Sequence, residues 1–272
     1  MTSNIGIVQM NSNSNTLENL EFAKKQIEQG SRNGLDLIAF PETFLYVGTD
    51  HQEKHKIAQS LEGKFIQTLQ EHALHFRISI LLGSLYETVP GDAHHLYNTS
   101  VLIDRGGNLV GVYRKIYMCD APALGYNESK GIKPGDTLVV VDHEVGKIGF
   151  SICYDLRFPE LYEALTTQGA EIIFVPAAFF LHTGKQHWIP LLTARAIENQ
   201  VYIVAPNQWG FHYEGRISYG YSVIIDPWGT VLCCAPERPC LVSAIIDLNY
   251  LKDVREKMPV LVHKRPKLYK KR

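Results

Sequence analysis

The sequence predicts an α/β fold with mixed sheets, and three observations lead to this expectation. Apolar runs of strand length alternate with segments whose apolar residues recur at helical spacing. Two pairs of such runs are joined only by short turns that contain glycine, which predicts hairpins and therefore antiparallel as well as parallel pairing. The 272 residues contain no low-complexity linker and no internal repeat, so we expect a single domain over residues 1–272.

In the first half of the chain, three apolar runs read as strands, namely "NIGIVQM" (4–10), "LDLIAF" (35–40) and "ISILLGSLY" (78–86). Asn15, with Glu18 three residues later, is expected to begin a helix that places Leu17, Leu20, Ala23 and Ile27 at helical spacing. Ser60 is expected to begin a second helix, with Phe65, Leu69 and Ala73 on one face. Strands at 98–104 and 109–115 flank the turn "RGGN", and an irregular stretch, 118–136, follows.

The same pattern resumes in the second half. Residues 157–168 and 185–199 read as helices. Strands are expected at "TLVVVD" (137–142), "KIGFSIC" (147–153), "EIIFVPAAF" (171–179), "VYIVAPN" (201–207) and "LVSAIIDL" (241–248). The runs "YGYSVIID" and "VLCCA" flank the turn "PWGT" and predict another hairpin.

Composition excludes several classes of protein. The net charge of −1 gives no global field that would favour nucleic acid or an anionic membrane, and no apolar run approaches the ~20 residues of a membrane span. The start of the chain lacks the pattern of a signal peptide, and five irregularly spaced cysteines argue against a disulfide framework. We therefore expect a cytoplasmic protein with free thiols. The tail carries six Lys or Arg in its last nine residues and is expected to be a solvated or subunit-contacting arm rather than a nucleic-acid site.

Cys153 stands where an apolar run ends and a helix with Pro159 in its early turns begins. Backbone N–H groups are unpaired at such a place and stabilise anions, so the pKa of this thiol is expected to be lowered. The same N–H groups can bind an oxyanion that forms when the sulfur attacks a carbonyl. The alternative is a buried structural thiol.

Two further polar residues leave apolar strands. Glu42 follows "IAFP", where a carboxylate could take a proton from a thiol or give one to a leaving amine; the alternative is an ordinary N-cap or surface glutamate. Lys115 follows "GVYR", where an ammonium could stabilise an oxyanion; the alternative is a solvated lysine. Together with Cys153 they would form a Cys-Glu-Lys set if the strands are neighbours.

These residues lie in three blocks, "FPETF" (40–44), "YRKIYMCD" (113–120) and "ICYDLRFPEL" (152–161). In their order and spacing, the blocks resemble the signature blocks of the nitrilase superfamily, the carbon–nitrogen hydrolases. The resemblance runs from residue 4 to about residue 269. It implies a four-layer αββα sandwich with mixed sheets inside and helices on the outer faces. It also implies a homodimer or higher homo-oligomer, with the tail, about residues 258–272, near a subunit contact.

The resemblance also implies a role for each site residue. Cys153 would form a thioester with the acyl part of a small amide, and Glu42 would act as general base and acid. Lys115 and the backbone N–H of Tyr154 would bind the oxyanion. Glu128, in "YNESKGIKPGD", matches a second glutamate that positions the lysine and the substrate. No metal and no organic cofactor are implied.

Tyr154-Asp155 follows the nucleophile where nitrile-cleaving members usually have Trp-Glu, so the chain resembles the amidase branches. Residues 183–212, 218–231 and 258–269 are most similar to amidases of deaminated glutathione, a carboxylate-bearing substrate that yields 2-oxoglutarate and cysteinylglycine. ω-Amidases of 2-oxoglutaramate and N-carbamoyl amide hydrolases remain alternatives, because they could use the same triad. A non-catalytic scaffold that kept the fold is the alternative from another class.

Three residues are expected to bind the substrate. Arg157 could hold a carboxylate bidentately, although a structural salt bridge, for instance to Asp155 or Glu160, is the alternative. Phe179 and Thr183 lie where such enzymes close the pocket.

Histidine chemistry is less well supported. His187 is expected to be a structural hydrogen-bonding residue rather than a partner of the thiol. His94 and His95 lack further ligands at metal-binding spacing.

Overall fold

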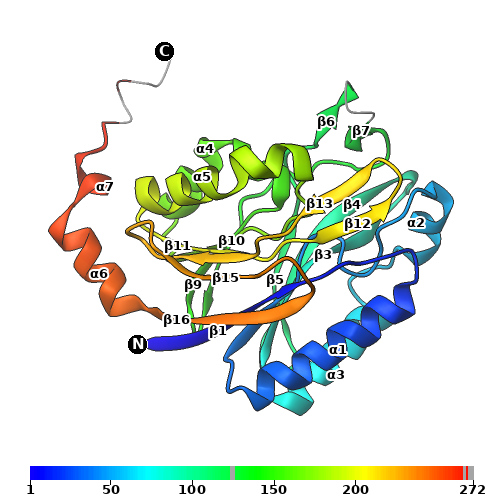
Figure 1. Cartoon of the computed structure of the whole chain (residues 1–272), viewed down its shortest axis with the longest axis horizontal. Helices are drawn as coiled ribbons and strands as arrows, with labels where there is room; N and C mark the ends of the chain where they lie inside the picture. The colour runs from blue at the N-terminus through cyan, green and yellow to red at the C-terminus, as the bar shows by residue number, and fades with distance from the viewer. Residues whose placement is uncertain (123–125, 266–267, 269–272) are drawn as a thin grey trace.

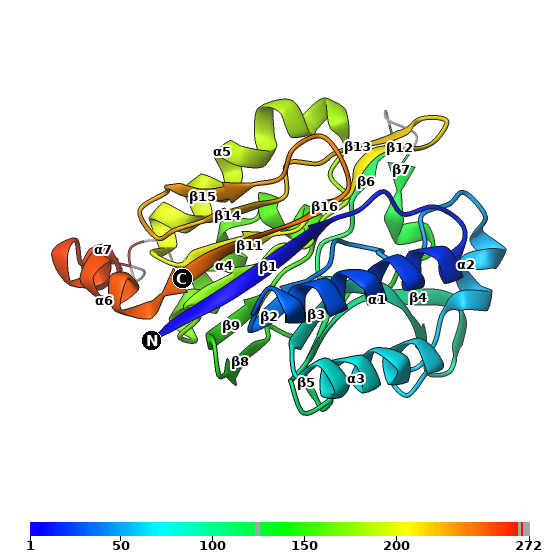
Figure 2. The ribbon, with the colours of Figure 1, turned by 60° about the horizontal axis from the view of Figure 1, so that its bottom comes forward.

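The computed structural model describes residues 1–122, 126–265 and 268, and its two largest elements are six-stranded sheets (Figure 1). The first sheet pairs β1 with β2 and β2 with β3 in parallel, and its other pairs are antiparallel. In Figure 2, β1 and β16 run side by side through the middle of the molecule. The strand order is β16 (Cys240–Asp247), β1 (Thr2–Gln9), β2 (Leu37–Ala39), β3 (Ser79–Val89), β4 (Asp92–Ile103) and β5 (Leu109–Arg114).

The second sheet repeats this plan, with two parallel pairs at its centre and antiparallel pairs outside them. Its order is β15 (Val231–Cys234), β14 (Val223–Ile225), β11 (Tyr202–Ala205), β10 (Ile172–Phe174), β9 (Gly146–Phe150) and β8 (Val140–His143). Two small ribbons complete the strands, β6 (Asp120–Ala121) with β7 (Tyr126–Asn127) and β12 (Trp209–Tyr213) with β13 (Arg216–Tyr219). Both predicted hairpins, β4–β5 and β14–β15, are confirmed.

Helices cover the outer face of each sheet (Figure 1). Helices α1 (Thr16–Arg32) and α3 (Lys64–Phe76) pack on the first sheet, and α4 (Pro159–Thr167) and α5 (Leu181–Asn199) pack on the second. The remaining helices are short: α2 (His51–Ile57), α6 (Leu248–Lys257), α7 (Val260–His263) and the 3-10 turns η2 (Glu128–Lys130) and η3 (Cys153–Arg157). The predicted αββα order of layers is confirmed.

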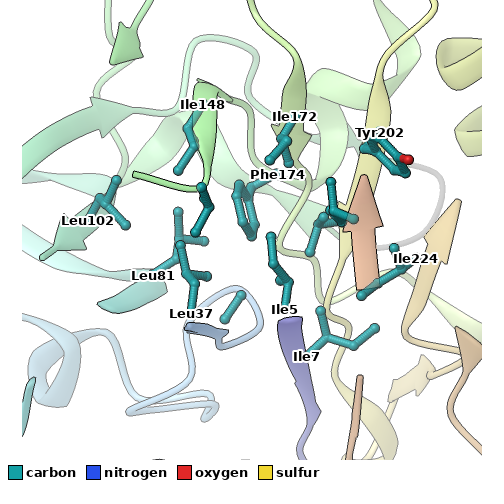
Figure 3. Packing of buried hydrophobic residues seen from close by; sticks show 14 of the residues in the cluster. Ile5, Ile7, Leu37, Leu81, Leu102, Ile148, Ile172, Phe174, Tyr202 and Ile224 are labelled. Carbon is teal, nitrogen blue, oxygen red and sulfur yellow. The ribbon is translucent and has the colours of Figure 1, made fainter. Parts of the chain in front are cut away.

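The inner faces of the two sheets share one apolar core, which Figure 3 shows from close by. Side chains from the first sheet, such as Ile5, Leu81 and Leu102, meet Ile148 and Phe174 from the second. All five are at most 1% exposed, so each removes nearly its whole apolar surface from water, worth about 1.5–3 kcal/mol a side chain. This core fixes the two sheets against each other, and with them the loops that leave their strand ends.

The starts of the first two long helices differ in how well the sequence predicts them. Asn15 caps α1 by accepting hydrogen bonds from the backbone N–H groups of Leu17 and Glu18, as predicted. Ser60 was wrong as the start of α3, because the chain turns through Gly63 before the helix begins at Lys64. Within the described residues no helix is long and apolar enough to cross a membrane. The predicted tail contact lies partly outside the described residues, at 266–267 and 269–272.

Candidate active site

The structure brings the three predicted residues Glu42, Lys115 and Cys153 to one place. Glu42 follows β2 and Lys115 follows β5, both in the first sheet, whereas Cys153 follows β9 in the second. All three side chains line the same small chamber, of about 30 Å³. The chamber therefore lies where the ends of strands from both sheets meet.

Close backbone contacts and left-handed backbone conformations position Glu42 and Cys153 at the ends of their strands. Gly83 of β3 lies directly against the Phe40 and Pro41 carbonyls, and a side chain there would collide with this backbone before Glu42. Thr43 and Cys153 both have left-handed backbone, with φ of 49° and 47°. Such a conformation costs a non-glycine residue of order 1 kcal/mol and is typical of functional sites. The backbone N–H of Cys153 is held by the Pro176 carbonyl at 2.9 Å.

Lys115 lies between two carboxylates. Its Nζ is 2.8 Å from Oε1 of Glu42 and 2.9 Å from both carboxylate oxygens of Glu128, and it is only 2% exposed. Glu128 also accepts a hydrogen bond from the backbone N–H of Cys119 at 2.8 Å. The predicted second glutamate thus contacts the lysine directly.

Asn98, in the middle of β4, was not predicted as a site residue. Its Nδ2 donates to Glu42 at 3.0 Å and to Glu128 at 3.3 Å, so it bridges the two carboxylates. The backbone N–H of Ala178 donates to Oε2 of Glu42 at 2.9 Å. The hairpin register could have revealed Asn98, since the Lys115 backbone N–H bonds to the Asn98 carbonyl.

These contacts set the protonation states of the pair. Burial alone would raise the pKa of Glu42, but the charge and hydrogen bond of Lys115 outweigh it and hold this pKa below its ordinary value. Burial likewise opposes the charged form of Lys115, yet Glu128 and Glu42 together raise its pKa well above the ordinary value. The site therefore holds an ionised Glu42 beside an ammonium at neutral pH.

The predicted lowering of the Cys153 pKa is wrong. Burial, followed by the charge of Glu42, raises the pKa of this thiol well above its ordinary value, and Lys115 offsets only part of that. The helix after it, η3, is a five-residue 3-10 turn, which provides little dipole. Cys153 is therefore a protonated thiol that needs a base.

Asp155 ties the nucleophile to the lysine strand. Its carboxylate accepts hydrogen bonds from the Tyr113 hydroxyl at 2.6 Å, the Tyr117 N–H at 2.9 Å and the Ile152 N–H at 2.8 Å. Burial raises its pKa to about 6 in spite of these bonds. The N–H of Tyr154 has no hydrogen-bond partner within residues 1–122, 126–265 and 268, and Tyr154 lines the chamber.

The three predicted substrate-binding residues, Arg157, Phe179 and Thr183, all line the chamber of Cys153. The guanidinium of Arg157 stacks near the Phe179 ring and lies 3.3 Å from Nδ1 of His187. Arg157 forms no ion pair with any of the described residues, Asp155 and Glu160 included, so the structural salt bridge is not observed. Among the described residues, His187 forms its polar contact with Arg157 and none with the thiol of Cys153, as expected.

A second, larger chamber of about 380 Å³ adjoins the first. The two share the lining residues Glu42, Tyr126, Ala178 and Arg216. Arg216 gave no signal in the sequence, because "HYEGRISY" reads as a turn with ordinary surface charges. Within the described parts of the chain, no group of three His, Cys, Asp or Glu side chains could hold a metal ion.

Comparison with known proteins shows which family the chain belongs to. A Synechocystis sp. (strain PCC 6803 / GT-S) protein named deaminated glutathione amidase is 43% identical over 94% of this chain and 96% of its own length. The human protein of that name is 39% identical over 97% of this chain and 83% of its own. The crystal structure of the C. elegans NitFhit protein superposes with a TM-score of 0.93 at 37% identity, covering 99% of this chain, which spans 66% of that longer protein. The family model of the carbon-nitrogen hydrolases matches residues 4–256, and this chain belongs to that family of enzymes.

Proposed function

We propose that this chain is an amidase that hydrolyses deaminated glutathione to 2-oxoglutarate and cysteinylglycine through a thioester on Cys153. The observation that carries the proposal is the buried cluster in which Lys115 bridges Glu42 and Glu128 beside the thiol. The names of relatives that match nearly the whole chain support the substrate.

In the acylation step, Sγ of Cys153 attacks the amide carbonyl carbon while Glu42 takes the thiol proton. A base is required because the pKa of the thiol is raised, and Glu42 is suited to the task because its own pKa is lowered. The tetrahedral oxyanion is stabilised by Lys115 and by the free N–H of Tyr154. The C–N bond then breaks, Glu42 returns the proton to the leaving amine, and a 2-oxoglutaryl thioester remains.

In the deacylation step, a water molecule enters where the amine has left. Glu42 takes one of its protons, and the oxygen attacks the thioester carbonyl. The same Lys115 and Tyr154 donors stabilise the second oxyanion. The C–S bond then breaks, 2-oxoglutarate leaves, and Glu42 gives the proton back to the sulfur of Cys153, which restores the resting enzyme.

Glu128 is proposed as a positioning residue for Lys115. An ammonium has three N–H donors, and both oxygens of Glu128 can share one of them. A second donor binds Glu42, which leaves the third for the oxyanion. Glu128 therefore orients Lys115 and still leaves one N–H donor of the ammonium for the oxyanion.

We propose that the acyl half of the substrate lies in the small chamber and the leaving amine in the larger one. The small chamber at Cys153 has room for the reacting carbonyl and a slim acyl chain, with Arg157 available for the acyl carboxylate and Phe179 and Thr183 at the wall. The larger chamber opens on the other side of Glu42, where the leaving amine must lie to be protonated. A leaving amine of dipeptide size suits this volume better than ammonia does, which favours deaminated glutathione over 2-oxoglutaramate.

The test is hydrolysis of deaminated glutathione beside 2-oxoglutaramate, followed by release of 2-oxoglutarate, with Cys153→Ala as the control. We expect a higher kcat/KM for deaminated glutathione and no turnover by Cys153→Ala. A preference for 2-oxoglutaramate would assign the chain to the ω-amidases instead. Retained turnover in Cys153→Ala would overturn the covalent mechanism.

Three broader features belong to the same proposal. We propose that residues 1–272 act as one catalytic unit, supported by the family match over residues 4–256. We also propose a homodimer or higher homo-oligomer and a cytoplasmic location, the latter supported by the five cysteines, all of which are free thiols. Sedimentation of the purified chain would test the assembly.

A further inference from the structure

The two connected chambers carry a surplus of positive charge. Their walls hold five cationic side chains and two carboxylates, a surplus of three positive charges on a chain whose net charge is −1. Both carboxylates, Glu42 and Glu128, are already bonded to Lys115. The remaining cations are therefore available to a ligand, and a ligand with negative charge is the one they favour.

Among these cations, Arg216 gives the strongest indication of a bound anion, because it is buried and has an N–H group that is unpaired in the part of the chain that the structure describes. It is only 7% exposed, and no carboxylate pairs with it among the described residues. Its Nη2 donates to the Ala178 carbonyl at 2.6 Å, and its guanidinium lies 4.0 Å from the Phe180 ring centroid and 5.5 Å from that of Tyr126. Nη1 is buried with no hydrogen-bond partner within residues 1–122, 126–265 and 268. A buried guanidinium that is held in place but left unpaired is costly unless a ligand supplies the anion.

Lys54 provides a second cation in the larger chamber. It lies on α2, and Figures 1 and 2 both place α2 at the same end of the molecule as β13, which carries Arg216. Its Nζ is 5.8 Å from the Tyr86 ring centroid, and no ion pair of Lys54 forms among the described residues. Lys54 is half-buried, whereas Lys56 on the same helix is exposed and pairs with Glu53.

Resting on the proposed function, we propose that Arg216 and Lys54 bind a carboxylate of the leaving amine in the larger chamber. The enzyme would then select amides with a carboxylate on each side of the scissile bond, one near Arg157 and one near Arg216. Cysteinylglycine ends in such a carboxylate, whereas ammonia has none. Arg216 and Lys54 are thus specificity residues for the amine half of the substrate.

The first test compares two amides that differ only in this group, deaminated glutathione and its C-terminal carboxamide. Lys54→Met should lower kcat/KM for the carboxylate substrate by about 10- to 100-fold, the usual cost of losing a hydrogen bond to a charged group, and change the carboxamide less than about threefold. Arg216→Gln should lower kcat/KM for the carboxylate substrate at least about tenfold more than for the carboxamide. Lys56→Met is the matched control and should behave as wild type. Equal losses on both substrates, or a wild type that cleaves both equally well, would overturn the proposal.

The second test does not need turnover, so it separates this proposal from the proposed function. Alanylglycine, which has no thiol, should protect Cys153 of the wild type from iodoacetamide, and alanylglycinamide should protect it at least about tenfold less well. Protection should be lost in Lys54→Met, which has little reason to misfold. If wild type cleaves neither amide but shows this pattern, the proposed function fails and the carboxylate site stands. Equal protection by both dipeptides, or by neither, refutes the site.

Discussion

Replacing Glu128 with glutamine would isolate the positioning of Lys115 from the chemistry at Cys153. Glutamine has the same shape, but it has one oxygen where Glu128 uses two. Oε2 of Glu128 accepts from both the Lys115 ammonium at 2.9 Å and the Cys119 N–H at 2.8 Å. Oε1 accepts from Lys115 at 2.9 Å and from Asn98 at 3.3 Å, and in glutamine one of these two acceptor oxygens becomes an NH₂. Its amide NH₂ then faces a donor, so at least one contact is lost.

The expected fall in kcat follows from the loss of one hydrogen bond to Lys115. A hydrogen bond to a charged group contributes about 1.5–3 kcal/mol. If the whole amount serves to hold Lys115 where the oxyanion forms, kcat falls about 10- to 150-fold, at about 1.4 kcal/mol for each factor of ten. The protein should still fold, because Lys115 retains Glu42 at 2.8 Å and no buried charge is left alone.

Steady-state hydrolysis of deaminated glutathione checks this expectation. Glu128→Gln should lower kcat by that factor and leave KM within about threefold, since the lost interaction acts in the transition state. Glu62→Gln, a change at an exposed glutamate, is the control and should match wild type. An unchanged kcat in a folded Glu128→Gln protein would show that Lys115 does not need Glu128 and would refute the reasoning.

Three further predictions concern the charges around Cys153. Glu42→Gln should lower the turnover of deaminated glutathione at least about 100-fold, because the general base is lost. Iodoacetamide should nevertheless alkylate Cys153 faster than in wild type, because the negative charge of Glu42, which helps to raise the thiol pKa, is gone. Slower alkylation would contradict this reasoning. In wild type the alkylation rate should keep rising above pH 9, and a plateau below that pH would show that the thiol is not perturbed as described. Lys115→Ala leaves Glu42 and Glu128 buried without a cation, which should cost about 3–5 kcal/mol in urea unfolding. Without Lys115, burial would raise the pKa of Glu42 in the folded state, so the loss should be larger at pH 7 than at pH 5.

Much of the fold could be predicted because its signals are local. Apolar runs of strand length and the Asn15 cap depend on residues near one another in the chain. The ribbon β12–β13 was missed because "WGFHY" and "RISY" alternate weakly, and their pairing depends on contacts elsewhere, such as the bridge from Phe180 to Ser218. Helix α5 begins at Leu181, four residues before its expected start.

In the active site, too, the residues with local sequence signals were predicted, and the properties that depend on distant contacts were not. Glu42, Lys115 and Cys153 were found because each follows an apolar strand within a recognisable block. Arg216 was not found, because its importance comes from burial beside Phe180 and from the absence of a partner in the described chain, neither of which a sequence displays. The direction of the Cys153 pKa shift was wrong for a related reason: burial and Glu42, 111 positions earlier in the chain, outweigh a short helix start.

Asp155 explains why a short block can specify a site built from two sheets. It stands two positions after Cys153, and two of its three hydrogen bonds go to Tyr113 and Tyr117, which lie two positions on either side of Lys115. A shift of the lysine strand along the interface would break both bonds at once, and breaking a buried bond to a carboxylate costs about 1.5–3 kcal/mol each. The third bond, from Ile152, holds the start of η3. Asp155 therefore couples the positions of the nucleophile and the ammonium, and this geometry requires the residue spacing within each of the two blocks.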